Sequence, residues 1–97
     1  MIRIVKMTFA PELVPEFEKL FNENKAKIRA FEGCTHLQLL RDINQTNIFF
    51  TYSFWNHPND LENYRQSELF NKVWRATKKL FSDKPEAWSV EQEVILE

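Results

Sequence analysis

The architecture of this 97-residue chain is set by one strongly apolar run, Ile48-Phe49-Phe50-Thr51-Tyr52-Ser53-Phe54-Trp55. The run is rich in aromatic and β-branched residues and lacks Gly and Pro, so it predicts a strand. Side chains of a strand alternate between two faces. One face therefore carries Ile48, Phe50, Tyr52 and Phe54, and the other carries Phe49, Thr51, Ser53 and Trp55. Because both faces hold aromatic residues, a sheet built around this strand needs a cover on each side.

Three further segments alternate with the same period of two. They predict a first strand at Ile2–Phe9, a second at Cys34–Asp42 and a last at Trp88–Leu96. The second strand and the run 48–55 form an antiparallel hairpin across a polar turn. Within the second strand, Cys34 and His36 are expected on one face, as a polar pair rather than as metal ligands. Three positions are open for this face: the side of the sheet that faces a second subunit, the rim of that side, or the side toward the helices.

Two helical regions separate the strands. Pro11 suits a first helical turn, and a long helix is predicted from residues that recur at steps of three and four: Leu13, Phe17, Leu20, Phe21, Asn24, Ile28 and Phe31. Gly33 is expected as its left-handed cap. A short helical piece begins at Pro58, capped by Asn56 or His57, and a second stretch capped by Ser67 continues to Phe81.

The resulting order, βαββαβ, predicts an α+β, ferredoxin-like fold with four antiparallel strands and both helical regions on one face. The whole chain, residues 1–97, is expected to be one domain. Val5 and Met7 lie opposite Ile2 and Ile4, so the first strand is also apolar on both faces. We predict that a second copy covers the open face, giving a homodimer with sheets packed face to face.

Composition excludes several classes of function. Thirteen basic and 14 acidic residues give a net charge of −1, which does not fit a nucleic-acid-binding or anionic-membrane-binding protein. One Cys and two His are too few for a closed zinc site, so no metal is expected. The single Cys34 fits a reducing compartment, and no apolar run approaches the roughly 20 residues of a membrane span. A cytoplasmic location without processing is expected.

A few polar groups fall among the apolar positions. Asn24 lies on the apolar stripe of the long helix, where it either bonds to local backbone or lines a cavity between helices and sheet. Tyr64, Trp55 and Trp74 are either core residues or the lining of an aromatic pocket, because Tyr and Trp pair a large apolar body with one polar group. The sequence leaves both alternatives open.

The stretch from Trp55 to Phe70, which begins Trp-Asn-His-Pro, resembles the antibiotic biosynthesis monooxygenase (ABM) domain family. In that family a strand-ending Trp is followed by a helix and a His-x-x-Ser-x-x-Phe segment, which here reads Tyr64-x-x-Ser67-x-x-Phe70. Glu32-Gly33-Cys34 is similar to the family's start of the second strand, and Leu80 to Trp88 is similar to its closing segment.

The resemblance implies a dimeric α/β-barrel and a monooxygenase, an oxidoreductase that uses molecular oxygen without metal or organic cofactor. Its implied substrate is a small aromatic quinol or polyphenol-like molecule. Tyr64, His36 and Asn24 become the candidate catalytic residues. His36 qualifies as a base only where its strand face turns toward the helices. The candidate substrate-binding residues are Trp55, Arg65, Phe70 and Trp74.

This sequence departs from the family pattern at two places, and each departure bears on the alternative functions. The family's His is Tyr64 here, which favours a rival function, a non-catalytic dimeric domain that binds small molecules or regulates. Isomerase or decomposition chemistry, found in relatives of the same barrel, is a third hypothesis. The heme-degrading branch uses an Asn and a His where this sequence has Val5 and Trp74, so heme degradation is disfavoured.

Overall fold

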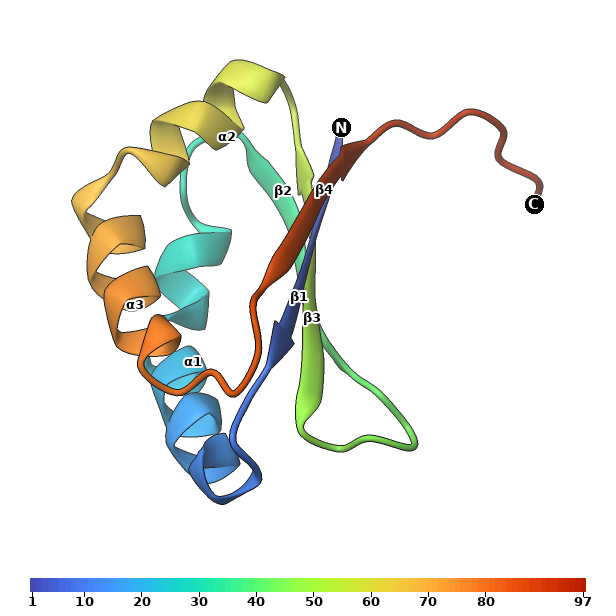
Figure 1. The fold of residues 1–97 in the computed structure, drawn as a ribbon. Coiled ribbons are helices and arrows are strands. Elements are labelled where there is room, and N and C mark those ends of the chain that lie inside the picture. Colours follow the sequence, from blue (N-terminus) through green and yellow to red (C-terminus); the bar gives the residue numbers. More distant parts are fainter.

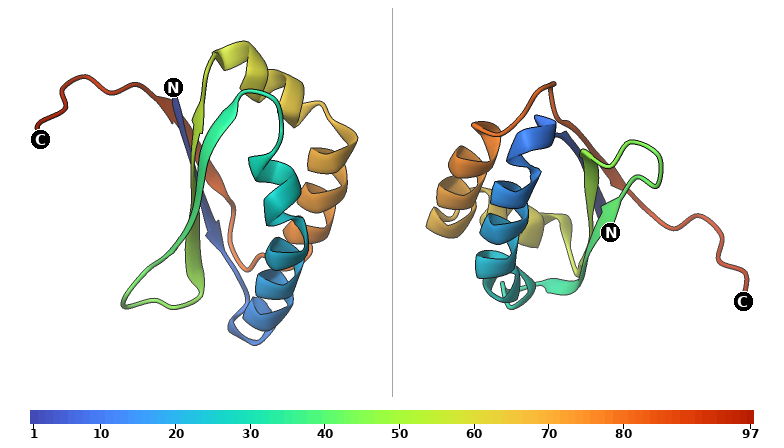
Figure 2. Two further views of the ribbon diagram at one scale, coloured as in Figure 1. Left: turned by 180° about the vertical axis from the view of Figure 1, so that it is seen from behind. Right: turned by 90° about the horizontal axis from the view of Figure 1, so that it is seen from below.

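The computed structural model describes residues 1–97 and confirms the α+β, ferredoxin-like βαββαβ fold (Figure 1). The elements in chain order are β1 (Ile2–Thr8), the short 3-10 helix η1 (Pro11–Leu13), α1 (Val14–Arg29), β2 (Cys34–Arg41), β3 (Ile48–Trp55), α2 (Pro58–Arg65), α3 (Glu68–Lys78) and β4 (Glu86–Val90). One antiparallel sheet has the strand order β2-β3-β1-β4. All helices lie on one side of this sheet, and the other side is open (Figures 1 and 2).

The predicted helix caps are present in the second helical region. The Nδ1 atom of His57 accepts a hydrogen bond from the backbone N–H of Asn59 at 3.1 Å, and Pro58 occupies the first turn of α2. The hydroxyl of Ser67 accepts from the backbone N–H of Phe70 at 3.1 Å at the start of α3. These contacts satisfy amide donors that have no partner inside the helix.

Gly33 has the predicted left-handed backbone, with φ of +88°, but its position relative to the helix differs from the prediction. Helix α1 already ends at Arg29, and its cap residue Ala30 is right-handed. Gly33 instead forms the turn that leads into β2. A Cβ atom at this position would overlap the side chain of Asp60 on α2, so the turn also needs glycine for close packing.

A β-bulge at the start of β2 overturns the prediction that Cys34 and His36 share a face. The pairing of β2 with β3 shifts register between these two residues. Cys34 is buried against Trp55 and Leu61 on the helix side, whereas the ring of His36 lies 4.8 Å from the ring of Phe54 on the open side. A bulge inserts one extra residue, and a shift of one residue moves a side chain to the opposite face.

The last strand was predicted at Trp88–Leu96; the strand is present, but its bounds differ from the prediction. Strand β4 spans Glu86–Val90 and pairs only with β1, where Val90 lies opposite Ile2. Residues after Val90 have no partner because β1 begins at Ile2. The alternation of residues 91–96 therefore does not produce a strand, and Val94, Ile95 and Leu96 are exposed.

The main core lies between α1 and the middle of the sheet. Its centre is Phe9, which is 0% exposed and whose ring stacks on Phe17 at 4.1 Å between centroids. Phe49 from β3 meets Phe17 edge-on at 5.1 Å. A second cluster is formed by Cys34, Trp55 and Leu61, and it packs α2 against the other end of β3.

No element of the chain covers the open face. Neighbouring rings on this face, those of Tyr52 and Phe54, are 5.3 Å apart. Leu40 and Trp88 are each 43% exposed. No helix of the chain is both long and hydrophobic enough to span a membrane.

Candidate functional site: an aromatic pocket between the helices and the sheet

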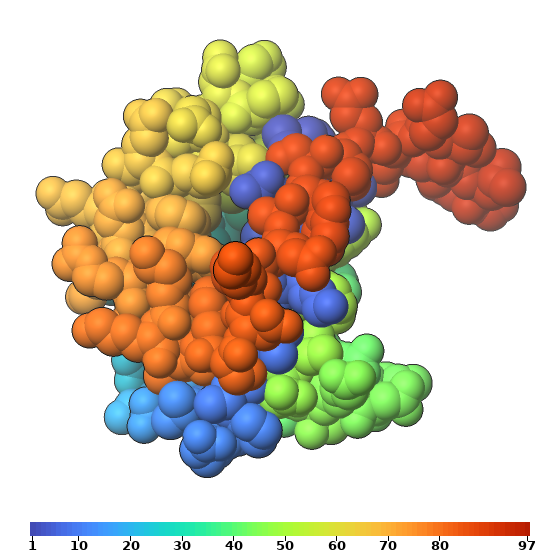
Figure 3. Space-filling view, in the orientation of Figure 1, coloured from blue at the N-terminus to red at the C-terminus, as the bar shows by residue number.

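A pocket of about 260 Å³ lies between the sheet and the helices. Its floor comes from β1, β3 and the start of β4, and its walls come from α1, α2 and α3. Most of the lining is hydrophobic and includes Phe21, Ile28, Phe70, Val73 and Trp74. The space-filling view shows a recess between the helices, in yellow and orange, and the blue and red strands β1 and β4 (Figure 3). The pocket therefore opens near the edge strand β4.

Trp55 and Tyr64 form one end of this pocket. Their rings stack with centroids 5.2 Å apart and planes inclined by 29°. The indole N–H of Trp55 donates to the hydroxyl of Ser53 at 3.0 Å. Both aromatic side chains line the pocket. Trp55 is only 3% exposed, and its polar group is satisfied within the protein.

The hydroxyl of Tyr64 makes no hydrogen bond within the chain and keeps access to solvent, because no fully buried side-chain polar atom lacks a partner; the residue as a whole is partly buried. Burial raises the pKa of Tyr64 to about 12, and the nearby Cys34 thiol adds a smaller effect in the same direction. Desolvation disfavours the phenolate. At neutral pH, Tyr64 is therefore a protonated phenol, a hydrogen-bond donor among the residues that line the pocket.

Phe70 and Trp74 form the wall supplied by α3. Their rings are nearly parallel, with an angle of 14° and a centroid distance of 5.8 Å. The edge of Phe70 also meets the ring of Tyr64 at 5.2 Å. Ser67 caps the start of α3, three residues before Phe70.

Two predicted site residues lie outside the pocket. Asn24 is buried on α1, where its amide N–H donates to the carbonyl of Leu20 at 2.8 Å, so it bonds to local backbone. His36 lies on the open face beside Tyr52 and Phe54, separated from Tyr64 by the sheet. A role as base required His36 to lie on the side of the sheet toward the helices. His36 lies on the opposite side.

The sequence profile of the family described as "Antibiotic biosynthesis monooxygenase" matches residues 1–76. This chain belongs to the ABM family. The match ends within α3, so β4 and the similarity noted between Leu80 and Trp88 fall outside it. None of the curated proteins matches the chain significantly.

Solved structures share the fold of this ABM domain. A crystal structure described as an antibiotic biosynthesis monooxygenase is 16% identical, with a TM-score of 0.87 over 95% of this chain and 98% of that chain. A conserved protein from Methanosarcina mazei is 22% identical, with a TM-score of 0.83 over 89% of this chain and 86% of its own. A protein from Pseudomonas aeruginosa is 23% identical, with a TM-score of 0.77 over 94% and 93%. At these identities the likeness shows the fold alone.

Five polar residues that line the ABM pocket were not predicted as site residues: Arg3, Thr51, Ser53, Thr77 and Glu86. The signal for Arg3 was present, because it shares a strand face with Val5 and Met7 and a charged group among apolar neighbours is unusual. Burial lowers the pKa of Arg3, and the positive charge of Arg65 lowers it further, while Glu62 acts in the opposite direction. Thr51 gave no comparable signal, since threonine is common on strands.

Proposed function

We propose that this chain is a cofactor-independent monooxygenase whose pocket binds a small aromatic, quinol or polyphenol-like substrate. The observation that carries this proposal is the aromatic pocket itself, which is lined by Trp55, Tyr64 and Trp74 among other hydrophobic residues. Small-molecule sites are typically apolar pockets with a few polar groups that orient the ligand. Membership of the ABM family supports the choice of reaction.

The size of the cavity supports a ring compound as the ligand. An apolar cavity of roughly 150 Å³ takes up one benzene molecule, and this pocket has about 260 Å³. A ligand with one or two rings therefore fits. Stacking against Trp55 and Trp74 would add to the gain from burying apolar surface, by about 0.5–1.5 kcal/mol per aromatic pair.

The proposed reaction needs no electron donor other than the substrate. A quinol and one O₂ molecule give a hydroxyquinone and water: one oxygen atom replaces a ring hydrogen, so a C–H bond breaks and a C–O bond forms, and the other leaves as water. The quinol gives up three hydrogens, of which two enter the water and one the new hydroxyl group. The quinol supplies all the electrons that reduce O₂. The protein then has to orient the ring, favour its anionic form and exclude bulk water.

The pocket residues suit this limited task. The lining contains no histidine, so the chain offers hydrogen bonding and positive charge rather than a neutral-pH base. In the proposal, Tyr64 donates its O–H to a substrate oxygen, Trp55 and Phe70 hold the ring, and Trp74 closes the wall. Arg65 supplies positive charge that favours the substrate anion.

The proposal also includes a homodimer that covers the open face. Phe50, Tyr52, Phe54 and Trp88 supply an aromatic surface on this face of the sheet, and no segment of the chain packs on it. Contiguous apolar surface of this kind is typical of an interaction site. Light scattering at micromolar concentration should give twice the monomer mass, and Phe54→Glu should give the monomer mass with an unchanged far-UV spectrum. A monomer mass for the unchanged protein would contradict the dimer.

Oxygen uptake tests the proposed reaction. Metal-free protein is mixed with 1,4-dihydroxynaphthalene and related quinols, and products are analysed by mass. We expect uptake above the protein-free rate and a product that has gained one oxygen atom. Tyr64→Phe should lower the rate at least tenfold, whereas the matched change Tyr52→Phe, on the opposite face, should leave it within twofold. Equal rates for Tyr64→Phe and the unchanged protein would remove Tyr64 from the mechanism.

One observation favours a second function, a non-catalytic binding domain. The family's His is replaced by Tyr64, whose pKa near 12 makes it unsuited to accept a proton. Binding of a quinol without oxygen uptake at any concentration of substrate would support this alternative and overturn the monooxygenase.

A further inference from the structure

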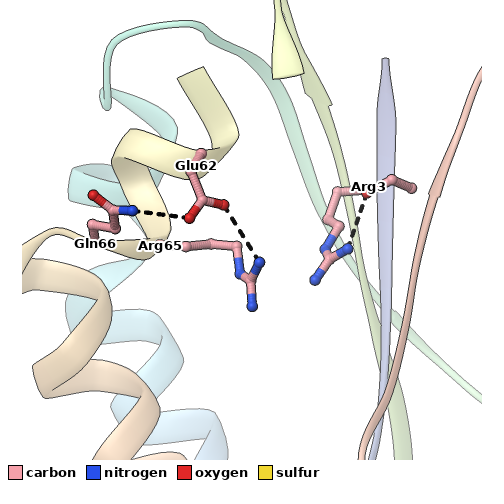
Figure 4. Close-up of polar contacts among 5 residues, drawn as sticks. Arg3, Glu62, Arg65 and Gln66 are labelled. Carbon is pink, nitrogen blue, oxygen red and sulfur yellow. Dashed lines mark hydrogen bonds and ion pairs between the residues drawn. The ribbon is translucent and has the colours of Figure 1, made fainter. Parts of the chain in front are cut away.

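Two arginine side chains face each other where the pocket opens. Arg3 extends from β1 and Arg65 from the last turn of α2, and Figure 4 shows their guanidinium groups pointing toward one another across the gap between helix and sheet. Both line the same pocket as Trp55 and Tyr64. Two like charges therefore border an otherwise aromatic cavity.

The chain only partly neutralises this pair. Glu62 is the one carboxylate in an ion pair with either arginine, and it lies 3.6 Å from Arg65, with both side chains about half exposed. Arg3 donates instead to the neutral hydroxyl of Ser89 at 3.0 Å. Glu86 belongs to the same region, but its carboxylate pairs with Lys6, its partner in the β1–β4 register, at 3.9 Å.

The remaining positive charge of Arg65 acts on Arg3, which lines the pocket. The pKa of Arg3 is lowered by burial and, next in size, by Arg65, and the opposing effect of Glu62 is smaller than that of Arg65. At Arg3, the repulsion from Arg65 is thus larger than the attraction of Glu62. An anion placed between the two arginines would relieve this repulsion, since guanidinium groups bind carboxylates through paired N–H donors.

We propose that the molecule bound in this pocket is a ring compound carrying a carboxylate, with the ring between Trp55 and Trp74 and the carboxylate between Arg3 and Arg65. The inference rests on the proposed function in using the same pocket, and it narrows the substrate class to aromatic acids. Neither arginine alone defines the site, because the two come from different elements that meet only in the folded chain.

Binding of a matched pair of stable probes tests this inference without any turnover. 2-Naphthoate and 2-naphthamide share a ring system and nearly the same shape, and only the first is charged at neutral pH. Calorimetry or quenching of tryptophan fluorescence gives both dissociation constants. We expect 2-naphthoate to bind at least tenfold more tightly than 2-naphthamide, and this ratio to fall as sodium chloride is raised.

Variants locate the source of the preference. Arg3→Gln and Arg65→Gln should each bring the affinity ratio of the two probes close to one, while Arg75→Gln, an exposed change on α3 outside the pocket, should keep it. Each ratio compares two ligands on the same variant. A loss of stability would weaken the binding of both ligands and would therefore leave the ratio unchanged. A ratio near one in the unchanged protein, or a ratio that survives both pocket substitutions, would overturn the inference, as would failure of both probes to bind.

The two proposals fail in different experiments. If 1,4-dihydroxynaphthalene is oxygenated but 2-naphthoate shows no preference, the monooxygenase stands and the carboxylate is wrong. If 2-naphthoate binds through Arg3 and Arg65 but neither 1,4-dihydroxynaphthalene nor 1,4-dihydroxy-2-naphthoate consumes oxygen, the carboxylate stands and the reaction is wrong.

Discussion

The two faces of the sheet are built from the same strands and similar side chains, but the chain treats them differently. Phe49 and Phe50 are adjacent in β3, yet Phe49 is 2% exposed against Phe17, and Phe50 lies on the face that no helix covers. The helix-facing side holds a pocket, and the open side holds a continuous aromatic surface. Apolar content therefore predicts that both faces need a cover, and only the tertiary structure shows which face the helices of the chain cover.

The two tyrosines show the same contrast. Tyr64 has ring contacts with Trp55, Phe31 and Phe70 and lines the pocket. Tyr52 lies on the open face, edge-on to Phe54. We expect a ligand role for the first and a packing role between subunits for the second.

The largest expected effect comes from truncating the two neighbouring phenylalanines. Phe49→Ala should lower the free energy of unfolding by about 3–5 kcal/mol, because it leaves a cavity in the core. Phe50→Ala should cost about 1 kcal/mol in dilute protein, as expected of a partly buried position outside the core. Urea unfolding at several protein concentrations measures both. The cost of Phe49→Ala should not depend on concentration, and that of Phe50→Ala should grow with it.

Equal costs for Phe49→Ala and Phe50→Ala in dilute protein would contradict the difference between the two faces. A cost of Phe50→Ala that is the same at every protein concentration would contradict the dimer on the open face.

Gly33→Ala tests how tightly the helical layer sits on the turn before β2. The change should destabilise the protein by about 1–3 kcal/mol, because alanine is strained at this positive φ and its Cβ would overlap Asp60. Ala30→Gly, at the right-handed cap of α1, provides a comparison in the same turn and should cost less. Urea unfolding measures both, and a Gly33→Ala variant of unchanged stability would show that α2 is free to move away.

The pH dependence of stability tests the burial of Tyr64. The pKa of Tyr64 is raised to about 12 in the folded state, whereas an unfolded tyrosine ionises near pH 10. The unfolded state therefore loses this proton first, and stability declines as pH rises from about 10 toward 12. Tyr64→Phe should lessen this decline, as measured by urea unfolding at pH 9, 10 and 11. The same slope in Tyr64→Phe and the unchanged protein would contradict the burial of this phenol.

The smallest effect is expected at the edge of the open face. Lys6 and Glu86 form an exposed ion pair at 3.9 Å, and such pairs contribute about 0–1 kcal/mol. Lys6→Ala should change the free energy of unfolding by less than about 0.5 kcal/mol, and added salt should reduce even that difference. A cost above 1 kcal/mol would mean that β4 depends on this pair for its position.

Much of the fold followed from residue patterns, and the exceptions have physical causes. Alternation and the caps His57 and Ser67 are local features, so they identified strands and helix starts. The last strand was misplaced because a strand needs a partner, and β1 offers none beyond Ile2. Part of the site was predictable in the same way: Trp55, Tyr64, Phe70 and Trp74 do line one pocket, whereas Asn24 satisfies its amide on Leu20.

The sequence by itself determined the order of elements, the apolar character of both sheet faces and the ABM resemblance, because these depend on period, spacing and residue type along the chain. Only the tertiary structure decided that a bulge turns His36 away from Cys34 and that Arg3 meets Arg65. A bulge depends on pairing with a second strand. The arginine pair joins residues 62 positions apart, since Arg3 lies on β1 and Arg65 on α2. Such juxtapositions arise from packing between elements, which no local pattern records.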